Sequence, residues 1–328
     1  MKKIFTTLFA SVLALSLVAC GTGNDDNNND VAGEDTTNNA DNNAENDANN
    51  DANNDVAEED YPSELVMGFV PSQDSANIAD TIAPLAERLE QELGIPVRGE
   101  VMTNYTATVE AMGNNQVHIG FLPPLGYVLA TERYDHIEAV LKSIRHGSST
   151  YKAQYTVRTD SDIQSLEDLE GKIWALADIT STSGYLFPAA QMMGEFGFET
   201  EQELQNFFGN IMTVGGHDNA LITVLEGDAD FATTFDDART AIVDDYPEAM
   251  EDLRVLGYTD EIPNDTISLT TNLPESLFDR IIEVFLSFND DEEMIQIMSD
   301  VYNWTGIDTA TDSDYDIIRR TYETLPQD

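Results

Sequence analysis

The folded part of the chain alternates strand-like and helix-like segments, and this order constrains its fold most strongly. Residues 65–70, 95–101 and 117–121 have the short apolar runs of buried strands, whereas residues 78–94 and 105–112 carry apolar side chains at helical spacing. Strands separated by helices are joined by right-handed crossovers and lie parallel in one sheet. We therefore predict an α/β unit in which helices cover a mostly parallel sheet.

The second half of the chain repeats this order. Its expected strands are residues 172–177, 210–214 and 230–234, and its expected helices are residues 185–194 and 218–225. Two more strand-like segments, residues 151–158 and 253–258, flank this half and are candidate crossovers to the first unit. Apolar residues at helical spacing between positions 281 and 301 predict a C-terminal part that packs back on the first unit. We expect two lobes: lobe one comprises residues 61–158 and 256–328, and lobe two comprises residues 159–255.

The first residues have the organisation of an export signal. Lys2 and Lys3 precede an apolar run, residues 4–18, which is too short for a membrane-spanning helix. The run ends in Leu-Val-Ala before Cys20, the only cysteine of the chain, so no disulfide forms within it. This ending resembles the bacterial lipobox, which implies a signal peptide over residues 1–19 and a lipid on Cys20. We expect an exported protein, in the periplasm or on the outer face of the cell membrane, that touches the membrane through its lipid anchor alone.

An acidic, asparagine-rich segment follows Cys20. Residues 21–60 contain 13 acidic residues, 13 asparagines and no lysine or arginine. Such a segment buries too little apolar surface to offset the entropy of ordering it, and its like charges extend it. Residues 20–60 are therefore predicted to be a disordered stalk between the lipid and the folded part.

The folded part is itself strongly acidic. From residue 61 onward, 49 acidic and 13 basic residues leave a net charge of −36. This charge excludes nucleic acid as a partner and indicates a strongly hydrated surface suited to high salt. An anionic ligand of this chain would have to be captured by short-range donors, because the long-range field opposes its approach.

A run of hydroxyls offers such donors. Ser181, Thr182 and Ser183 stand between an expected strand and an expected helix and are followed by a glycine. The first N–H groups of a helix have no internal partner and carry the positive end of its dipole, so clustered hydroxyls there suit a tetrahedral oxyanion. A plain helix cap is the alternative interpretation of the same residues.

Other polar residues fall at the carboxyl ends of expected strands, where ligands bind in α/β folds. Tyr105 opens a helix after one strand, and its phenol is a donor for an anion or a half-buried rim residue. His217 follows two glycines that let the backbone come close to a ligand, and a simple contact at the start of its helix is the alternative. The acids Asp236, Asp237 and Asp265 also lie in loops, where a solvated surface charge is the alternative.

The sequence gives little support to catalysis. Ser183, His217 and Asp237 can be drawn as a hydrolase triad, but no Gly-x-Ser-x-Gly motif is present. There is no phosphate-binding Walker motif and no metal-ligand spacing of His and Cys. We therefore predict no catalytic residue, no metal and no cofactor.

Four motifs together resemble a known family. They are Asn104-Tyr105, the strand 117–121, the run Ser-Thr-Ser-Gly-Tyr at 181–185 and Gly-His-Asp-Asn-Ala at 216–220. In this order they are similar to the periplasmic phosphate, phosphite and phosphonate-binding proteins of ABC importers, over residues 65–326. The resemblance implies a two-lobed periplasmic-binding-protein fold (type II-like), with the ligand in a cleft between the lobes.

The resemblance also implies roles for residues. Ser181, Thr182, Ser183, Tyr105 and His217 would bind the phosphorus-bound oxygens. Asp237 and Asp265 match acids that hold the ammonium of an aminoalkyl phosphonate. Leu122 stands where some members have a ligand-binding tyrosine, and Tyr127 is its candidate substitute.

The expected function is capture of a phosphorus oxyanion by a monomeric lipoprotein that closes like a hinge and delivers the ligand to an ABC permease and its ATPase. A carboxylate near an oxyanion requires a proton or a cation between them, so the ligand is either a protonated oxyanion or one with an ammonium group. A sensory protein without transport, or a Ser/His/Asp hydrolase, are the alternative functions.

Overall fold

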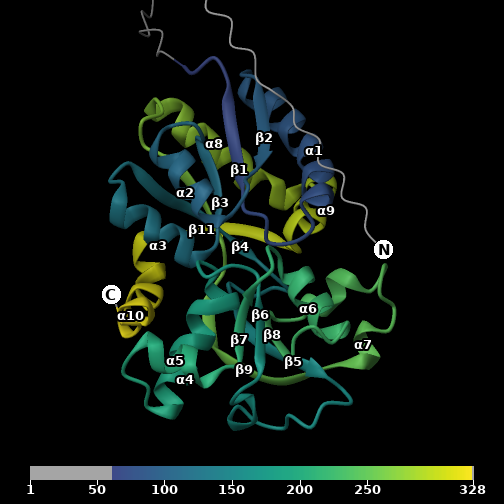
Figure 1. The fold of residues 1–328 in the computed structure, drawn as a ribbon. Coiled ribbons are helices and arrows are strands. Elements are labelled where there is room, and N and C mark those ends of the chain that lie inside the picture. Colours follow the sequence, from purple (N-terminus) through teal and green to yellow (C-terminus); the bar gives the residue numbers. More distant parts are fainter. Residues whose placement is uncertain (1–60, 327–328) are drawn as a thin grey trace, which may run out of the picture. The chain divides into compact units, whose positions relative to one another are not determined.

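The computed structural model describes residues 61–326, and their strands form two sheets, one in each of two lobes (Figure 1). The expected signal peptide, Cys20 and the acidic stalk lie outside the described residues. The α/β class and the two lobes predicted from the sequence are confirmed.

The sheet of the first lobe has six strands, and its centre is built from the βαβ units that the sequence predicts. Its order across the sheet is β11 (Gly306–Thr309), β4 (Ile137–Ile144), β10 (Thr266–Thr270), β3 (Ile119–Leu122), β1 (Leu65–Phe69) and β2 (Val97–Val101). Strand β1 pairs parallel with β2 and β3, whereas β10 runs antiparallel to β3 and β4. The sheet is therefore mixed rather than mostly parallel.

Helices cover this sheet and supply its core. They are α1 (Ser75–Leu93), α2 (Tyr105–Gly113), α3 (Pro124–Arg133), α8 (Glu275–Ser287), α9 (Glu292–Tyr302) and α10 (Asp316–Thr324). Apolar side chains of α1, α8 and α9 pack with Phe69, Phe121 and Trp304. The C-terminal helices α8 and α9 thus return to the first lobe, as the sequence predicts.

The sheet of the second lobe has five strands. Its order is β7 (Asn210–Thr213), β6 (Ile173–Leu176), β8 (Phe231–Phe235), β5 (Thr150–Arg158) and β9 (Leu253–Pro263), and its helices are α4 (Phe187–Phe196), α5 (Glu201–Phe207), α6 (His217–Leu225) and α7 (Ala249–Asp252). Strand β6 is parallel to β7 and β8, and β5 is antiparallel to β8 and β9, so this sheet is mixed as well. The buried rings of Trp174 and Phe231 stack at the centre of its core.

The chain passes between the sheets twice, and these crossovers correct the predicted lobe boundaries. Residues 145–149 join β4 to β5, and residues 264–265 join β9 to β10. The prediction assigned residues 151–158 and 256–263 to lobe one, but both segments pair with each other inside the second sheet. The strand before each crossover lies in one sheet and the strand after it lies in the other, with no helix between them. The strands at these crossovers pair antiparallel with their neighbours, so both sheets are mixed.

None of the helices between residues 61 and 326 combines the length and the apolar character that a bilayer span needs.

Candidate functional site

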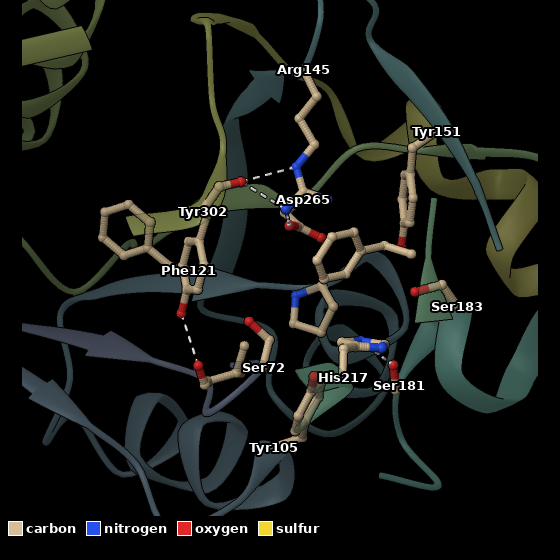
Figure 2. A pocket seen from close by; sticks show the side chains of 13 residues that line it. Ser72, Tyr105, Phe121, Arg145, Tyr151, Ser181, Ser183, His217, Asp265 and Tyr302 are labelled. Carbon is tan, nitrogen blue, oxygen red and sulfur yellow. Dashed lines mark hydrogen bonds and ion pairs between the residues drawn. The ribbon is translucent and has the colours of Figure 1, made fainter. Parts of the chain in front are cut away.

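Loops at the carboxyl ends of strands from both lobes line one small cavity (Figure 2). Its volume is about 30 Å³, and it is lined by Val70, Ser72, Tyr105, Phe121, Pro123, Arg145, Tyr151, Ser181, Ser183, His217, Phe235, Asp265 and Tyr302. A main-chain hydrogen bond joins the two lobes at this cavity, because the N–H of His217 donates to the carbonyl oxygen of Ser72 at 2.9 Å.

The hydroxyl run forms one wall of the cavity. Ser181 follows β6 and caps a π-helical turn, residues 182–186, where its Oγ accepts a hydrogen bond from the N–H of Gly184 at 3.0 Å. π-helical turns are rare and often occur at functional sites. Because that bond uses only a lone pair, the hydroxyl hydrogen of Ser181 can donate either to a ligand or to His217 Nε2, which lies 3.4 Å away. Ser183 is buried beside it and lines the same cavity.

Two ring-bearing residues at helix starts also line the cavity, Tyr105 from the first lobe and His217 from the second. Tyr105 opens α2 because Asn104 caps that helix by accepting from the N–H of Ala107. His217 opens α6 after Gly215, whose φ of +93° favours glycine. Tyr105 Oη and His217 Nδ1 are both buried without a hydrogen-bond partner among the described residues. Buried polar atoms of this kind normally have partners, so both are suited to meet atoms of a ligand.

His217 is a neutral group in this environment. Burial lowers its pKa to about 3, and the positive charge of Arg145 acts in the same direction. Its Nε2 lies 3.4 Å from Ser181 Oγ. At neutral pH the imidazole therefore contributes one N–H donor rather than a charge.

The stability of the protein should therefore fall as the pH is lowered from 6.5 toward 3. In this window the unfolded imidazole binds a proton and the folded one does not, which costs at most ~1.4 kcal/mol of unfolding free energy per pH unit. A His217→Gln variant lacks this contribution and should show a shallower dependence on pH. Urea unfolding of both proteins at fixed high salt measures the difference, and equal slopes would contradict the burial of a neutral His217.

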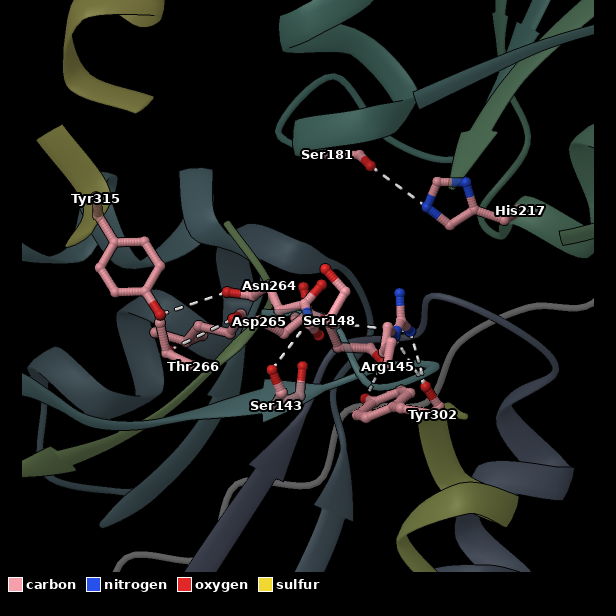
Figure 3. Close-up of polar contacts among 12 residues, drawn as sticks. Ser143, Arg145, Ser148, Ser181, His217, Asn264, Asp265, Thr266, Tyr302 and Tyr315 are labelled. Carbon is pink, nitrogen blue, oxygen red and sulfur yellow. Dashed lines mark hydrogen bonds and ion pairs between the residues drawn. The ribbon is translucent and has the colours of Figure 1, made fainter. Parts of the chain in front are cut away.

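Arg145 and Asp265 supply the charges of the cavity, and both lie on the crossovers (Figure 3). Their atoms Nη2 and Oδ2 are 3.9 Å apart. Burial raises the pKa of Asp265, whereas Arg145 opposes this rise. Burial also raises the pKa of Tyr105 well above its usual value, so its phenol keeps its proton. A protonated Asp265 leaves one net positive charge, and an ionised Asp265 leaves none.

Five of the predicted site residues thus come together: Tyr105, Ser181, Ser183, His217 and Asp265 all line the cavity. Thr182 does not, because its Oγ1 accepts a hydrogen bond from the N–H of Leu125 at 2.9 Å and joins the two lobes. Tyr127 is packed against Tyr315 and donates its hydroxyl to Asp312 at 2.7 Å. It cannot replace the tyrosine missing at Leu122.

Asp237 lies outside this cavity as well. It follows β8 with a φ of +57° and lines a neighbouring cavity of about 100 Å³. The suggested triad of Ser183, His217 and Asp237 is therefore not assembled, which removes the basis of the hydrolase alternative. Cys20 lies outside the described residues.

Several lining residues escaped the sequence analysis, namely Ser72, Arg145, Tyr151 and Tyr302. Arg145 carried one signal, because it is a cation between two strand-like segments in a chain that has few cations. Tyr302 ends α9 and reaches the cavity only through tertiary packing, so its spacing in the sequence gave no hint.

Two α/β lobes with a lined cavity between them have the architecture of the periplasmic-binding-protein fold. The chain belongs to the family described as "ABC transporter, phosphonate, periplasmic substrate-binding protein", whose profile matches residues 67–315. Members of this family bind substrate for a transporter, and the chain is accordingly a binding protein rather than an enzyme.

Similar proteins support this assignment. The phosphate-import protein PhnD of Mycolicibacterium smegmatis is 26% identical over 277 residues, which cover 80% of this chain and 85% of the relative. The binding component of an ABC phosphonate transporter from Pseudomonas aeruginosa has the same fold, with a TM-score of 0.72, 21% identity and coverage of 80% and 86%. PhnD1 from Prochlorococcus marinus, solved with methylphosphonate, gives a TM-score of 0.70 at 19% identity, with coverage of 80% and 98%.

Proposed function

We propose that this protein captures a phosphorus oxyanion in the cavity between its lobes and delivers it to the permease of an ABC importer. The observation that carries the proposal is the set of donors in one small cavity: Ser181, Ser183 and His217 from the second lobe face Tyr105 from the first. Two of these groups, Tyr105 Oη and His217 Nδ1, have no partner among residues 61–326. Phosphorus-bound oxygens would satisfy them.

The donors are neutral, and Arg145 adds the single positive charge next to Asp265. Such a cavity suits an anion of low charge. Because burial raises the pKa of Asp265, this carboxyl can share a proton with the oxyanion instead of repelling it. The strongly acidic surface then does not prevent binding, since recognition depends on aimed short-range donors.

Closure of the lobes is part of the proposed mechanism. Tyr105 and Ser72 belong to the first lobe, whereas Ser181, Ser183 and His217 belong to the second. A ligand that contacts both sets favours the closed arrangement over an open one. The bonds from His217 N–H to Ser72 and from Leu125 N–H to Thr182 add to that preference. The closed shape would be the one that docks on the permease.

We also propose that the protein acts as a tethered monomer. A signal peptide over residues 1–19, a lipid on Cys20 and an acidic stalk to residue 60 would hold the binding domain near its permease. A stalk rich in Asp and Asn would be strongly hydrated and would separate the binding domain from the membrane surface.

Isothermal titration calorimetry with phosphate, phosphite, methylphosphonate, 2-aminoethylphosphonate, sulfate and molybdate tests the proposal. At least one phosphorus compound should bind with one-to-one stoichiometry and raise the melting temperature, whereas sulfate and molybdate should have little effect. If no phosphorus compound binds, or if sulfate binds best, the proposed function is wrong.

A further inference from the structure

Arg145 is fixed at the edge of the cavity by contacts from both lobes. It is 8% exposed, and its Nε and Nη2 donate to the carbonyl oxygen of Tyr302 at 3.1 and 2.8 Å. Its guanidinium also lies over the rings of Phe235 and Tyr151, at 5.1 and 5.7 Å from their centroids. A cation held by two hydrogen bonds and two rings is a rigid feature of the cavity rather than a mobile surface charge.

This arginine separates two cavities. The cavity of about 30 Å³ that holds Tyr105, Ser181 and His217 is called the donor cavity here. Arg145 and Phe235 line both this cavity and the neighbouring one of about 100 Å³. The acids Asp236 and Asp237 line only the second cavity. A ligand in the donor cavity can therefore reach these acids only past the guanidinium and the ring.

The charge around the donor cavity also disfavours a cationic substituent. The carboxyl group of Asp265 lies beside the guanidinium of Arg145, and 3.9 Å separates Asp265 Oδ2 from Arg145 Nη2. An ammonium group placed beside Asp265 would thus stand close to a guanidinium that cannot lose its proton. Val70, Phe121 and Pro123 add apolar surface, and the other polar groups of the lining are neutral hydroxyls and an imidazole. Asp265 is therefore the one carboxyl among the lining residues that could pair with an ammonium.

We propose that Arg145 is the residue that determines specificity, and that it restricts the ligand to small phosphorus oxyanions. Phosphate, phosphite and methylphosphonate carry no cationic group, whereas the ammonium of an aminoalkyl phosphonate would stand close to the guanidinium and is disfavoured by charge. This inference rests on the proposed function. It assigns Asp265 to a shared proton with the oxyanion rather than to an ammonium.

Titration calorimetry of the wild-type protein tests the inference without any variant. The best of phosphate, phosphite and methylphosphonate should bind at least ~100-fold more tightly than 2-aminoethylphosphonate, because like charges brought together strongly disfavour the wrong ligand. If 2-aminoethylphosphonate binds equally well or better, the role of Arg145 is refuted while the proposed function stands. If none of the four binds, the proposed function fails, and this inference fails with it.

Arg145→Ala then tests whether the arginine causes the preference. The substitution joins the two cavities and exposes Asp265 and Asp236 to the ligand, so the ratio of the two affinities should fall at least ~10-fold. The exposed Arg98 pairs with Glu64 and Glu100 and is not among the residues that line the cavity. Arg98→Ala should therefore remove the same charge without changing the ratio. Arg145→Lys retains the charge if the alanine variant does not fold, and it should keep most of the preference. An unchanged ratio in Arg145→Ala contradicts the proposal.

Discussion

Replacing Ser181 and Ser183 together by alanine should lower the affinity for the phosphorus oxyanion by ~100-fold or more, since each hydrogen bond to a charged group is worth about 1.5–3 kcal/mol. Both hydroxyls line the cavity and are buried, so water cannot readily take their place beside the ligand. Titration calorimetry with the tightest phosphorus ligand gives the ratio of dissociation constants directly.

Two controls separate loss of ligand contacts from loss of structure. Ser181 also caps the turn that follows it, so the double variant should lose about 1 kcal/mol of stability, which thermal unfolding of the empty protein measures. Thr182→Val removes the neighbouring hydroxyl, which contacts Leu125 instead of the cavity. It should weaken binding by less than ~10-fold, because it loses one hydrogen bond of closure and no ligand contact. A loss as large as that of the double serine variant would show that the cavity is not the binding site.

The sequence located much of this cavity because of a general property of α/β folds. Tyr105, Ser181 and His217 each follow a strand that could be recognised from its own residues, and the carboxyl ends of parallel strands share one edge. The regular alternation of elements therefore places these side chains together before any contact is known. The same argument holds in both lobes, which is why two walls of one cavity could be predicted.

The site residues that were wrongly predicted or missed depend on tertiary contacts and backbone conformation, which the local sequence pattern does not show. Tyr127 lies on α3, and the position of the 3₁₀ turn at residues 312–315, just before α10, decides that its hydroxyl meets Asp312 rather than the cavity. Asp237 has a left-handed backbone conformation that places it in the neighbouring cavity. Arg145 belongs to a crossover, where the residues of one segment serve both lobes, so neither lobe considered alone reveals its role.

The crossovers also hold a polar residue whose loss should strongly destabilise the protein. Asn264 is fully buried, and its Nδ2 donates to the carbonyl oxygens of Ser143 and Ser148 at 3.0 and 2.8 Å. The main-chain N–H of Asn264 donates to the carbonyl oxygen of Ser149 at 3.0 Å, and the main-chain carbonyl oxygen of Asn264 accepts from the hydroxyl of Tyr315. One side chain thus ties the two crossovers together, as Figure 3 shows.

Asn264→Ala should lower the free energy of unfolding by about 2–4 kcal/mol, because two buried carbonyl groups lose their donor and a small cavity remains. For a folded part of this size that corresponds to a fall in melting temperature of roughly 4–16 °C. Asn272→Ala is the matched control, since Asn272 is exposed and donates to Asn115 at 2.8 Å. Its loss should change stability by less than about 0.5 kcal/mol.

Asn264→Asp distinguishes the donor role of this side chain from its volume. Aspartate has nearly the same shape as asparagine but presents acceptor atoms to the two carbonyl oxygens, so it must either remain protonated or repel them. We therefore expect Asn264→Asp to be at least as unstable as Asn264→Ala at pH 7 and to recover part of the difference at low pH, where the carboxyl gains a proton and can donate one bond. If the aspartate variant is instead more stable than the alanine variant at pH 7, the crossovers are held by packing and not by these hydrogen bonds.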